Sequence, residues 1–260
     1  MQALRTAATG MSAQQLNVEV ISNNIANMNT VGFKKQRAEF QDLLYHTIER
    51  AGAMAAEGAI VPTGVQIGGG VKAGSVYRIT EQGAVTQTGN PYDMAISGRG
   101  FFQVLMPSGE TAYTRAGNLS LNADGQLVTE DGYALQPAIA VPGDATSISI
   151  SKSGEVQAIR EGQADAEVVG QIELANFVNE AGLSAIGDNL LVETAASGPA
   201  NVGAPGAIGF GNLLQGYTEA SNVDAVTEIT ALIIAQRAYE MNSKVISAAD
   251  EMLQAANAVK

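Results

Sequence analysis

The chain has 260 residues, 46% of them hydrophobic, which is enough for one large domain or two modest domains with apolar cores. Its 26 acidic residues outnumber its 14 basic residues, and the net charge of −12 argues against nucleic acid or an anionic membrane surface as a partner. The absence of cysteine excludes disulfides, thiolate metal sites and a cysteine nucleophile, and a single histidine, His46, excludes a histidine-rich metal site.

Residues 1–28 predict an amphipathic helix in which Gly10 is a weak point. On a seven-residue repeat, position a falls on Leu4, Met11, Val18 and Ile25, and position d on Ala7, Gln14, Ile21 and Met28. Asparagines crowd just before Gly32, and because Asn and Gly favour turns we expect the helix to end there. The N-terminus lacks the pattern of a cleavable secretory signal, and no run approaches the ~20 apolar residues of a membrane span.

The next segments predict an arm. Residues 33–45 are interpreted as a helical or extended arm with a partly apolar face. Residues 46–74 are rich in Ala, Gly and Glu and end near Gly68-Gly69-Gly70, a composition typical of an extended connection. Two interpretations of 46–74 stay open: a disordered linker, or an arm that becomes ordered only against a neighbouring subunit.

Residues 75–215 predict a β-rich domain. Apolar and β-branched runs alternate with Gly-containing turns, and segments 101–114, 119–128 and 148–159 have the pattern of hairpins. Many short strands of this kind favour an antiparallel barrel or sandwich. Residues 195–216 are rich in Gly, Ala and Pro and lead to the last element.

Residues 222–258 predict a single helix, roughly 54 Å long at ~1.5 Å per residue. Position a of its heptads falls on Ala225, Leu232, Tyr239, Ile246 and Leu253, and position d on Glu228, Ala235, Asn242, Ala249 and Ala256. A helix of this length buries little on itself, so its apolar face needs a partner. The helix at the other end of the chain is the candidate.

The predicted fold class is α+β, with long N- and C-terminal helices pairing as a coiled coil and a central antiparallel β-rich domain. The predicted domains are a discontinuous helical core of residues 1–45 and 216–260, an extended arm of residues 46–74 and an outer β domain of residues 75–215. Periodicity alone leaves two interpretations: ordinary amphipathic helices packed on a globular core, or termini that join each other and other copies as an assembly device. In the second, the helix seam comprises Leu4, Met11, Val18, Ile25, Leu232, Tyr239, Asn242, Ile246 and Leu253, and polar Gln14 and Asn242 fix its register.

No catalytic, cofactor-binding or metal site is predicted. Gly98-x-Gly100 lacks the third glycine of a dinucleotide site and does not open a helix. The sequence Asn122-x-Asp124-Gly125 is similar to half of a calcium loop, but no acidic residue follows at the required spacing.

Three isolated features have simpler interpretations than catalysis. Asp93 has no evident partner carboxylate, so a turn or cap role is favoured, and His46 beside a flexible stretch is interpreted as solvated. The basic residues Lys34, Lys35 and Arg37 form a patch that is either a solvated surface or a contact for acidic neighbours in an assembly.

Three segments resemble, in the same order, the motifs of flagellar rod and hook proteins: residues 23–34 (NNIANMNTVGFK), 93–102 (DMAISGRGFF) and 236–244 (QRAYEMNSK). The motif residues are Asn24, Ala26, Asn27, Thr30, Gly32, Phe33, Lys34, Gly98, Gly100, Phe101, Phe102, Gln236, Arg237 and Tyr239. Segments 40–45 (FQDLLY) and 215–223 (QGYTEASNV) are similar to the distal-rod members in particular. The resemblance spans essentially the whole chain and is weakest in residues 46–60 and 195–212.

The resemblance implies a structural subunit of the bacterial flagellar distal rod, without enzymatic activity or cofactor. It implies that many copies stack helically into a rigid hollow drive shaft that transmits torque from motor to hook, with the terminal helices around an export channel and the β domain outside. It also implies that the segment after the first arm, here roughly residues 46–66, stiffens the tube, although its composition departs from the family's more polar version.

The resemblance further implies a place and a set of partners. The place is the basal body, crossing the periplasm, reached without a cleavable signal peptide through the flagellar type III export apparatus. The partners are other copies of the chain, proximal rod proteins, the hook protein or hook–rod neighbours, and the P- and L-ring proteins, without nucleic acid or membrane insertion. Two alternatives stay open: a proximal-rod or hook subunit of the same family, and a secreted β-rich enzyme or adhesin with helical ends.

Overall fold

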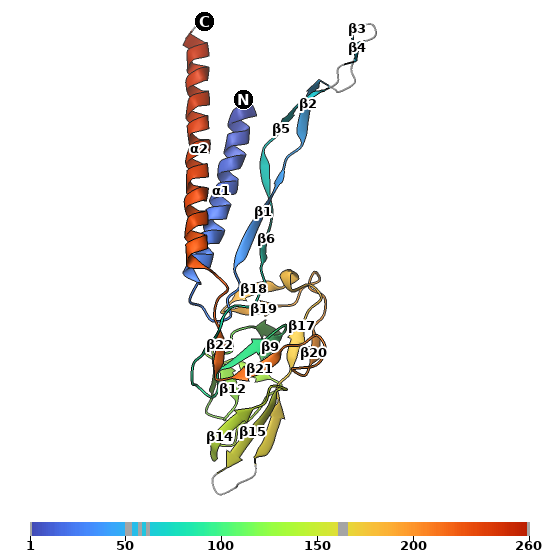
Figure 1. Cartoon of the computed structure of the whole chain (residues 1–260), viewed down its shortest axis with the longest axis vertical. Helices are drawn as coiled ribbons and strands as arrows, with labels where there is room; N and C mark the ends of the chain where they lie inside the picture. Colours follow the sequence, from blue (N-terminus) through green and yellow to red (C-terminus); the bar gives the residue numbers. More distant parts are fainter. Residues whose placement is uncertain (1, 50–53, 57–58, 61–62, 161–165, 259–260) are drawn as a thin grey trace. The chain divides into compact units, whose positions relative to one another are not determined.

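A computed structural model of the chain describes residues 2–49, 54–56, 59–60, 63–160 and 166–258 (Figure 1). It divides into two compact units. Unit 1 consists of Met1–Ala26, Gln36–Tyr77 and Asp224–Lys260, and unit 2 of Asn27–Lys35 and Arg78–Val223. The chain therefore passes between the two units four times.

The two helices belong to unit 1 and pack along each other. They are α1 (Gln2–Ala26) and α2 (Ala225–Ala258). As predicted, α1 ends at the asparagine-rich turn, where the Thr30 amide donates to the carbonyl of Asn27 over 3.2 Å. The carboxylate of Asp224 caps α2 by accepting a hydrogen bond from the Thr227 amide at 3.1 Å. Neither described helix is long and apolar enough to cross a membrane.

The strands of unit 1 form an arm of nested pairs, β1 with β6, β2 with β5 and β3 with β4. Their bounds are β1 (Gln36–Asp42), β2 (Tyr45–Glu49), β3 (Met54–Ala56), β4 (Ala59–Ile60), β5 (Val65–Gly68) and β6 (Val71–Arg78). Of the two interpretations of residues 33–45, the extended one is confirmed over β1. The described parts of residues 46–74 are largely paired strands, and residues 50–53, 57–58 and 61–62 lie outside the described residues.

Unit 2 contains the remaining strands and a short 3-10 helix. They are β7 (Val85–Gln87), β8 (Met94–Ser97), β9 (Phe101–Leu105), β10 (Thr111–Thr114), β11 (Leu119–Leu121), β12 (Leu127–Thr129), β13 (Ala134–Gln136), β14 (Ala145–Ile150), β15 (Glu155–Arg160), β16 (Glu167–Gln171), β17 (Leu174–Asn176), η1 (Glu180–Gly182), β18 (Ser184–Gly187), β19 (Leu190–Val192), β20 (Asn201–Gly203), β21 (Asn212–Gln215) and β22 (Tyr217–Glu219). The largest sheet runs in the order β11-β12-β13-β9-β10-β19-β18, and β17 pairs with both β9 and β20. Smaller antiparallel groups are β14-β15-β16, β8 with β21, and β7 with β22.

The predicted hairpins are confirmed, because β9 pairs with β10, β11 with β12 and β14 with β15 in antiparallel register. A helix at each end and a central antiparallel β-rich region make the fold α+β. The core of unit 2 lies between the sheets, with Phe102, Met94 and Leu174 fully buried. A smaller cluster stacks Phe177 edge-on against Tyr113, with ring centroids 4.8 Å apart.

Candidate assembly surfaces

The predicted heptad frame of α2 coincides with its less exposed face. The shielded positions of the frame are Ala225, Glu228, Leu232, Ala235, Asn242, Ile246 and Ala249. Two seam residues depart from this pattern, since Tyr239 is 42% exposed and Leu253 is 37% exposed. On the side of α1, Leu4, Met11, Val18 and Ile25 are half-buried.

The buried residues of α1 do not follow one seam. They are Ala7, Ala13, Val20, Ile21 and Asn24, of which only Ala7 and Ile21 belong to the predicted frame. The reason is that α1 packs against β1 as well as against α2. A helix with two neighbours buries two adjacent stripes, and a heptad frame describes only one of them.

Gly10 and Asn242 mark a close approach of the two helices. A Cβ atom added at Gly10 would lie 3.0 Å from Nδ2 of Asn242. Gly10, interpreted from sequence as a weak point, therefore leaves room for the polar residue of the opposite helix. At this point Asn242 lies against α1.

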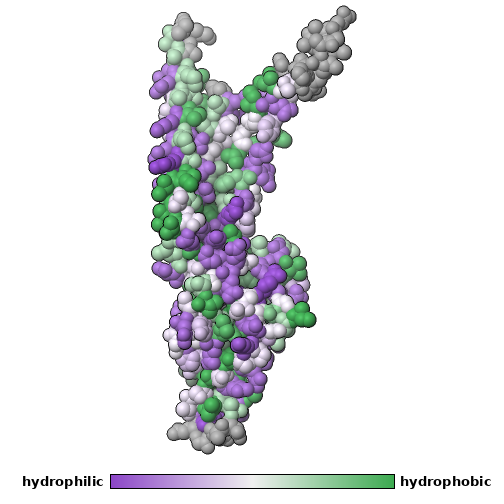
Figure 2. All heavy atoms as spheres, in the orientation of Figure 1, coloured by the Kyte–Doolittle hydropathy of each residue, from purple (hydrophilic) through white to green (hydrophobic). Residues whose placement is uncertain are grey.

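The rest of α2 exposes an unusual amount of apolar side chain. Its exposed large hydrophobic residues are Val226, Ile229, Ile233, Ile234, Tyr239, Met241, Val245, Met252 and Leu253. Figure 2 shows hydrophobic residues on the visible face of this helix. An apolar surface of this extent is characteristic of a protein contact rather than of a solvated helix.

Asn24, from the first motif, has a structural role inside unit 1. Its side chain is 1% exposed and forms reciprocal 2.8 Å hydrogen bonds with the backbone of Gln36, donating to the carbonyl and accepting from the amide. Nδ2 also donates to Oε2 of Glu228, which lies in the first turn of α2, at 3.1 Å. One amide side chain thus joins the end of α1, the start of β1 and the start of α2.

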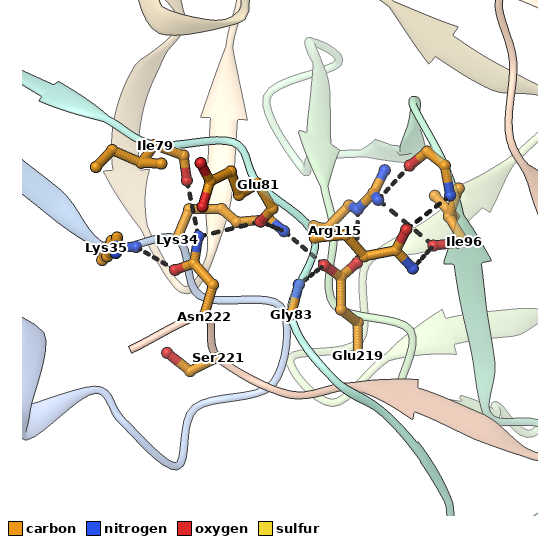
Figure 3. A network of polar contacts seen from close by, with 12 residues as sticks. Lys34, Lys35, Ile79, Glu81, Gly83, Ile96, Arg115, Glu219, Ser221 and Asn222 are labelled. Carbon is orange, nitrogen blue, oxygen red and sulfur yellow. Dashed lines mark hydrogen bonds and ion pairs between the residues drawn. The ribbon is translucent and has the colours of Figure 1, made fainter. Parts of the chain in front are cut away.

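Unit 2 contains a buried ionic cluster, the Glu219 hub, formed by Lys34, Gly83, Arg115 and Glu219 (Figure 3). Nζ of Lys34 lies 2.5 Å from Oε1 of Glu219, and Nε of Arg115 lies 2.7 Å from Oε2. The Gly83 amide donates to Oε1 at 2.9 Å. The three charged side chains are between 1% and 7% exposed.

The two cations set the protonation of the hub. Burial alone raises the pKa of the Glu219 carboxyl, but Arg115 and Lys34 outweigh it and hold that pKa below its ordinary value. Burial also lowers the pKa of Lys34, and the bond to Glu219 opposes this only in part. A carboxylate facing two buried cations is therefore ionised at neutral pH.

The second motif, residues 93–102, supplies backbone carbonyls that accept hydrogen bonds from Arg115. Its guanidinium donates to the carbonyls of Gly98, at 2.5 Å, and Gly100. Both glycines have a positive φ, +115° and +133°, which turns these carbonyls toward the arginine at little cost for a residue without Cβ. The same motif places Phe101 and Phe102 in the two apolar clusters of unit 2.

Asn222 makes a second clamp beside the hub (Figure 3). Its Oδ1 accepts from the Lys35 amide at 2.7 Å, and its Nδ2 donates to the carbonyls of Ile79 and Glu81 at 2.9 and 3.0 Å. Hub and clamp together bind the three segments of unit 2 through which the chain continues into unit 1, around residues 32–35, 78–83 and 219–223.

Other motif residues have more local roles or none within one chain. Gly32 has a φ of +70° and no room for a Cβ atom, which would lie 2.6 Å from the Ala116 nitrogen. The hydroxyl of Thr30 donates to Oδ1 of Asn27 at 3.1 Å. Within the described parts of the chain, the exposed Gln236 and Arg237 make no hydrogen bond or ion pair. Ala26 ends α1, and Phe33 is half-buried.

The residues considered from sequence as possible calcium-binding or catalytic residues lie in local turns or on the surface. Oδ1 of Asn122 accepts from the amides of Asp124 and Gln126, at 3.0 and 2.8 Å, and so closes the β11–β12 turn. Asp93 accepts from Thr88 and Asn90, as a turn role requires, and His46 is exposed on β2. Lys34 of the predicted basic patch is not a surface residue, because it is buried in the hub.

Comparison with known proteins bears on all of these regions. Three family descriptions match: "Flagella basal body rod protein" over residues 4–34, "Flagellar hook protein FlgE/F/G D1 domain" over 95–158, and "Flagellar basal body rod FlgEFG protein C-terminal" over 214–259. The "Flagellar basal-body rod protein FlgG" of Caulobacter vibrioides is 72% identical across 100% of both chains. That of Agrobacterium fabrum is 54% identical across 97% of both chains.

The chain belongs to the FlgG family of flagellar basal-body rod proteins. It is accordingly a structural subunit of the flagellar rod and not an enzyme. A FlgF protein of Caulobacter vibrioides is 34% identical over 92% of this chain, far below the FlgG protein of the same organism. Each of the three matched regions contributes one charge to the Glu219 hub: Lys34, Arg115 and Glu219.

Proposed function

We propose that the chain is the subunit of the distal rod and polymerises helically into a rigid hollow drive shaft, which transmits torque from motor to hook and encloses the export channel. The exposed apolar side chains of α2 carry this proposal. A helix that packs against α1 on one face and still presents Ile233, Ile234 and Met241 to solvent needs further partners. Copies of the same chain supply them in an open helical assembly, whose contacts join two different surfaces of the subunit.

Within this assembly, we infer that α1 and α2 pair as a coiled coil. Support comes from the packing of the two helices, from the coincidence of the heptad frame with the shielded face of α2, and from the approach of Gly10 to Asn242. The seam proposed from sequence, Leu4 to Ile25 on α1 and Leu232 to Leu253 on α2, then has two parts. Its shielded residues join the helices of one chain, while Tyr239 and Leu253 stay available to a neighbouring copy.

The partners and location proposed for the chain follow the family. They are other copies of itself, proximal rod proteins, the hook protein or its rod-side neighbours, and the P- and L-ring proteins, with export through the flagellar type III apparatus. The location is the distal rod across the periplasm, reached without a cleavable signal peptide.

Another axial subunit of the family, in the proximal rod or hook, is the alternative. The 72% identity to a FlgG protein, against 34% to the FlgF protein of the same organism, favours the distal rod.

Electron microscopy of the purified full chain at high concentration tests the proposal. We expect tubes, with circular dichroism showing more helix after assembly than before, because a lone amphipathic helix lacks its partner face. A variant lacking residues 1–28 is expected to form no tubes and to abolish motility. Tubes formed without those residues, or no tubes from the intact chain, would contradict the proposal.

A further inference from the structure

The segment between β20 and β21 forms a compact loop held by its own backbone. The Gly206 amide donates to the carbonyl of Gly211 at 3.0 Å, and the Phe210 amide donates to the carbonyl of Ala207 at 2.9 Å. Nδ2 of Asn176, on β17, donates to the carbonyl of Gly209 at 3.0 Å. These bonds fix the loop on the surface of unit 2.

This fixed loop presents its largest aliphatic side chain entirely to solvent. Ile208 is 103% exposed, as much as in an extended chain. Two further exposed valines lie on or next to the strands that adjoin the loop: Val178, just after β17 and 84% exposed, and Val202, on the neighbouring strand β20. An isoleucine held fully exposed by an ordered loop gains nothing within its own chain.

The stretch of sequence that contains the loop is poor in charge. Residues 194–218 contain no charged side chain, although charged residues make up 15% of the chain. Depletion of charge together with exposed apolar residues distinguishes the buried centre of an interface from ordinary surface. Charged residues border this stretch at Arg99, whose carbonyl accepts from the Gly211 amide at 2.7 Å, and at Lys152, whose carbonyl accepts from the Leu213 amide of β21 at 3.2 Å.

Unit 2 also contains a groove of complementary character. It lies over the β9–β10 hairpin and strands β18 and β19, and its apolar lining includes Met106, Tyr113, Ile186 and Val192. Glu110 and Glu193 stand at the same groove. Among the described residues, neither glutamate forms an ion pair, and neither does Lys152 beside the loop.

We propose that the Ile208 loop of one copy inserts into the β10–β18–β19 groove of a second copy, as a contact between the β-rich units of neighbouring subunits. The apolar tip fits the apolar lining, and Lys152 matches Glu110 and Glu193 in charge. Because the loop and the groove are different surfaces of one unit, the contact repeats without closing and extends a helical stack.

The second copy is favoured over a surrounding ring protein as the occupant. The inference rests on the proposed function, in which the rod is a rotating drive shaft and the P- and L-ring proteins are among its partners. An apolar anchor facing a ring would oppose that sliding, whereas a neighbouring subunit turns together with the loop. The ring protein is accordingly a different outcome of the test.

The absence of cysteine allows a site-specific test. Ile208→Cys is labelled with a maleimide-linked photo-crosslinker, assembled into tubes, irradiated and digested, and the captured peptides are identified by mass spectrometry. We expect a covalent dimer whose captured peptides contain residues 106–113 or 184–193. Val168→Cys, at another exposed aliphatic position of unit 2, is the matched control and is expected to capture other peptides.

The outcomes separate the two proposals. Tubes with cross-links to any other region, or with none, would overturn the docking of Ile208 while leaving polymerisation intact. Absence of tubes from the unmodified chain would refute the proposed function and this contact with it. In basal bodies isolated from cells, a cross-link from position 208 to a ring protein would assign the loop to that partner instead.

A substitution that preserves the fold gives a second readout. Ile208→Ser removes only a solvated side chain from the monomer, so its melting temperature should not change. The concentration needed for tube formation should rise by about tenfold or more, and Val168→Ser should raise it less than about twofold. Equal effects of the two substitutions would overturn the inference.

Discussion

Glu219 is almost fully buried between two cations, and the energetics of such a carboxylate are asymmetric. Replacing all three charges by apolar groups of the same shape can be neutral, because desolvation of the ions offsets much of their attraction. Removing the carboxylate alone leaves Lys34 and Arg115 charged and without their counter-ion in the same cavity. The hub is thus most sensitive to the loss of its single anion.

The substitution Glu219→Gln should destabilise unit 2 by about 3–5 kcal/mol, the cost of breaking a buried ion pair. Urea unfolding of the full chain, followed by tyrosine fluorescence, measures this loss. Glu167→Gln is the matched control, since Glu167 pairs with Arg160 on the surface and its side chain is 51% exposed. Its loss should stay below about 1 kcal/mol, and losses of equal size would show that the hub contributes no more than a surface pair.

The hub should also make stability depend on acid pH. The pKa of Glu219 is lower in the folded chain than in the unfolded chain, because Arg115 and Lys34 outweigh the effect of burial. The unfolded state therefore binds the proton more readily, and the contribution of Glu219 is complete above the ordinary glutamate pKa of about 4.3. It is lost as the pH falls from that value through the folded pKa. Urea unfolding across this pH range measures the stability difference between wild type and Glu219→Gln. This difference should be constant near neutral pH and shrink below pH ~4.3. A difference that stays constant at all pH values would contradict the assigned role of Glu219.

Sequence reasoning singled out Lys34 but not its partners, and the reason is distance along the chain. Glu219 is 185 residues from Lys34 and 104 residues from Arg115. No local period or spacing links residues so far apart. The glycines of the second motif were a usable signal, since Gly98 and Gly100 turn their carbonyls toward Arg115. The sequence alone does not show which side chain donates to these carbonyls.

At the scale of elements, the helix pair depends on a small residue opposite a polar one. Gly10 costs α1 about 1 kcal/mol of helix propensity relative to alanine. In return, the helices approach closely enough for Asn242 to lie against the backbone of α1. A polar residue held in one place along a helix pair disfavours shifted alignments, because any shift would bury it against apolar side chains.

Filling this space should therefore separate the helices. We expect Gly10→Leu to lower the stability of the helix pair by about 1–3 kcal/mol, the usual cost of overpacking, despite the gain in helix propensity. Ala8→Leu, at an exposed position of the same helix, is the control and should not be destabilising. Thermal unfolding followed by circular dichroism at 222 nm measures both, and Asn242→Ala should recover part of the loss in Gly10→Leu. Equal behaviour of the two leucine variants would show that position 10 is not a helix contact.

The elements themselves were largely predictable because their signals are local. The uninterrupted heptads of α2, the asparagines after α1 and the glycine turns of three hairpins each lie within a few residues of the structure they specify. The frame of α1 was less informative, since β1 buries a second stripe that includes neither Leu4 nor Met11. Pairing of the arm strands was also not predicted, because β1 and β6 are separated by the low-complexity segment between them.

At the scale of the whole molecule, the main open feature is the apolar surface that α2 exposes, because a single chain does not cover it. Within unit 1, α2 has one helical neighbour, and its outward residues from Val226 to Met252 contact solvent. In the proposed polymer, other copies cover this face of the helix, and we therefore expect polymerisation and folding of unit 1 to be coupled. Substitutions on the two faces of α2 should therefore separate the stability of the monomer from that of the tube.

Ile234 and Leu232 provide this separation. Ile234 is 64% exposed, so Ile234→Ala should leave the helix content and melting temperature of the monomer unchanged. Leu232 is half-buried in the helix pair, so Leu232→Ala should lower both the stability of the monomer and its assembly. Loss of one buried aliphatic contact costs about 1.5–3 kcal/mol, so the critical concentration for Ile234→Ala should rise about tenfold or more. Sedimentation of tubes over a concentration series gives this value. The control is Ser243→Ala, which replaces an exposed polar residue of the same helix. If Ile234→Ala assembled like Ser243→Ala, the outward face of α2 would not be a contact between copies, and the surface that carries the proposed function would have to lie elsewhere on the chain.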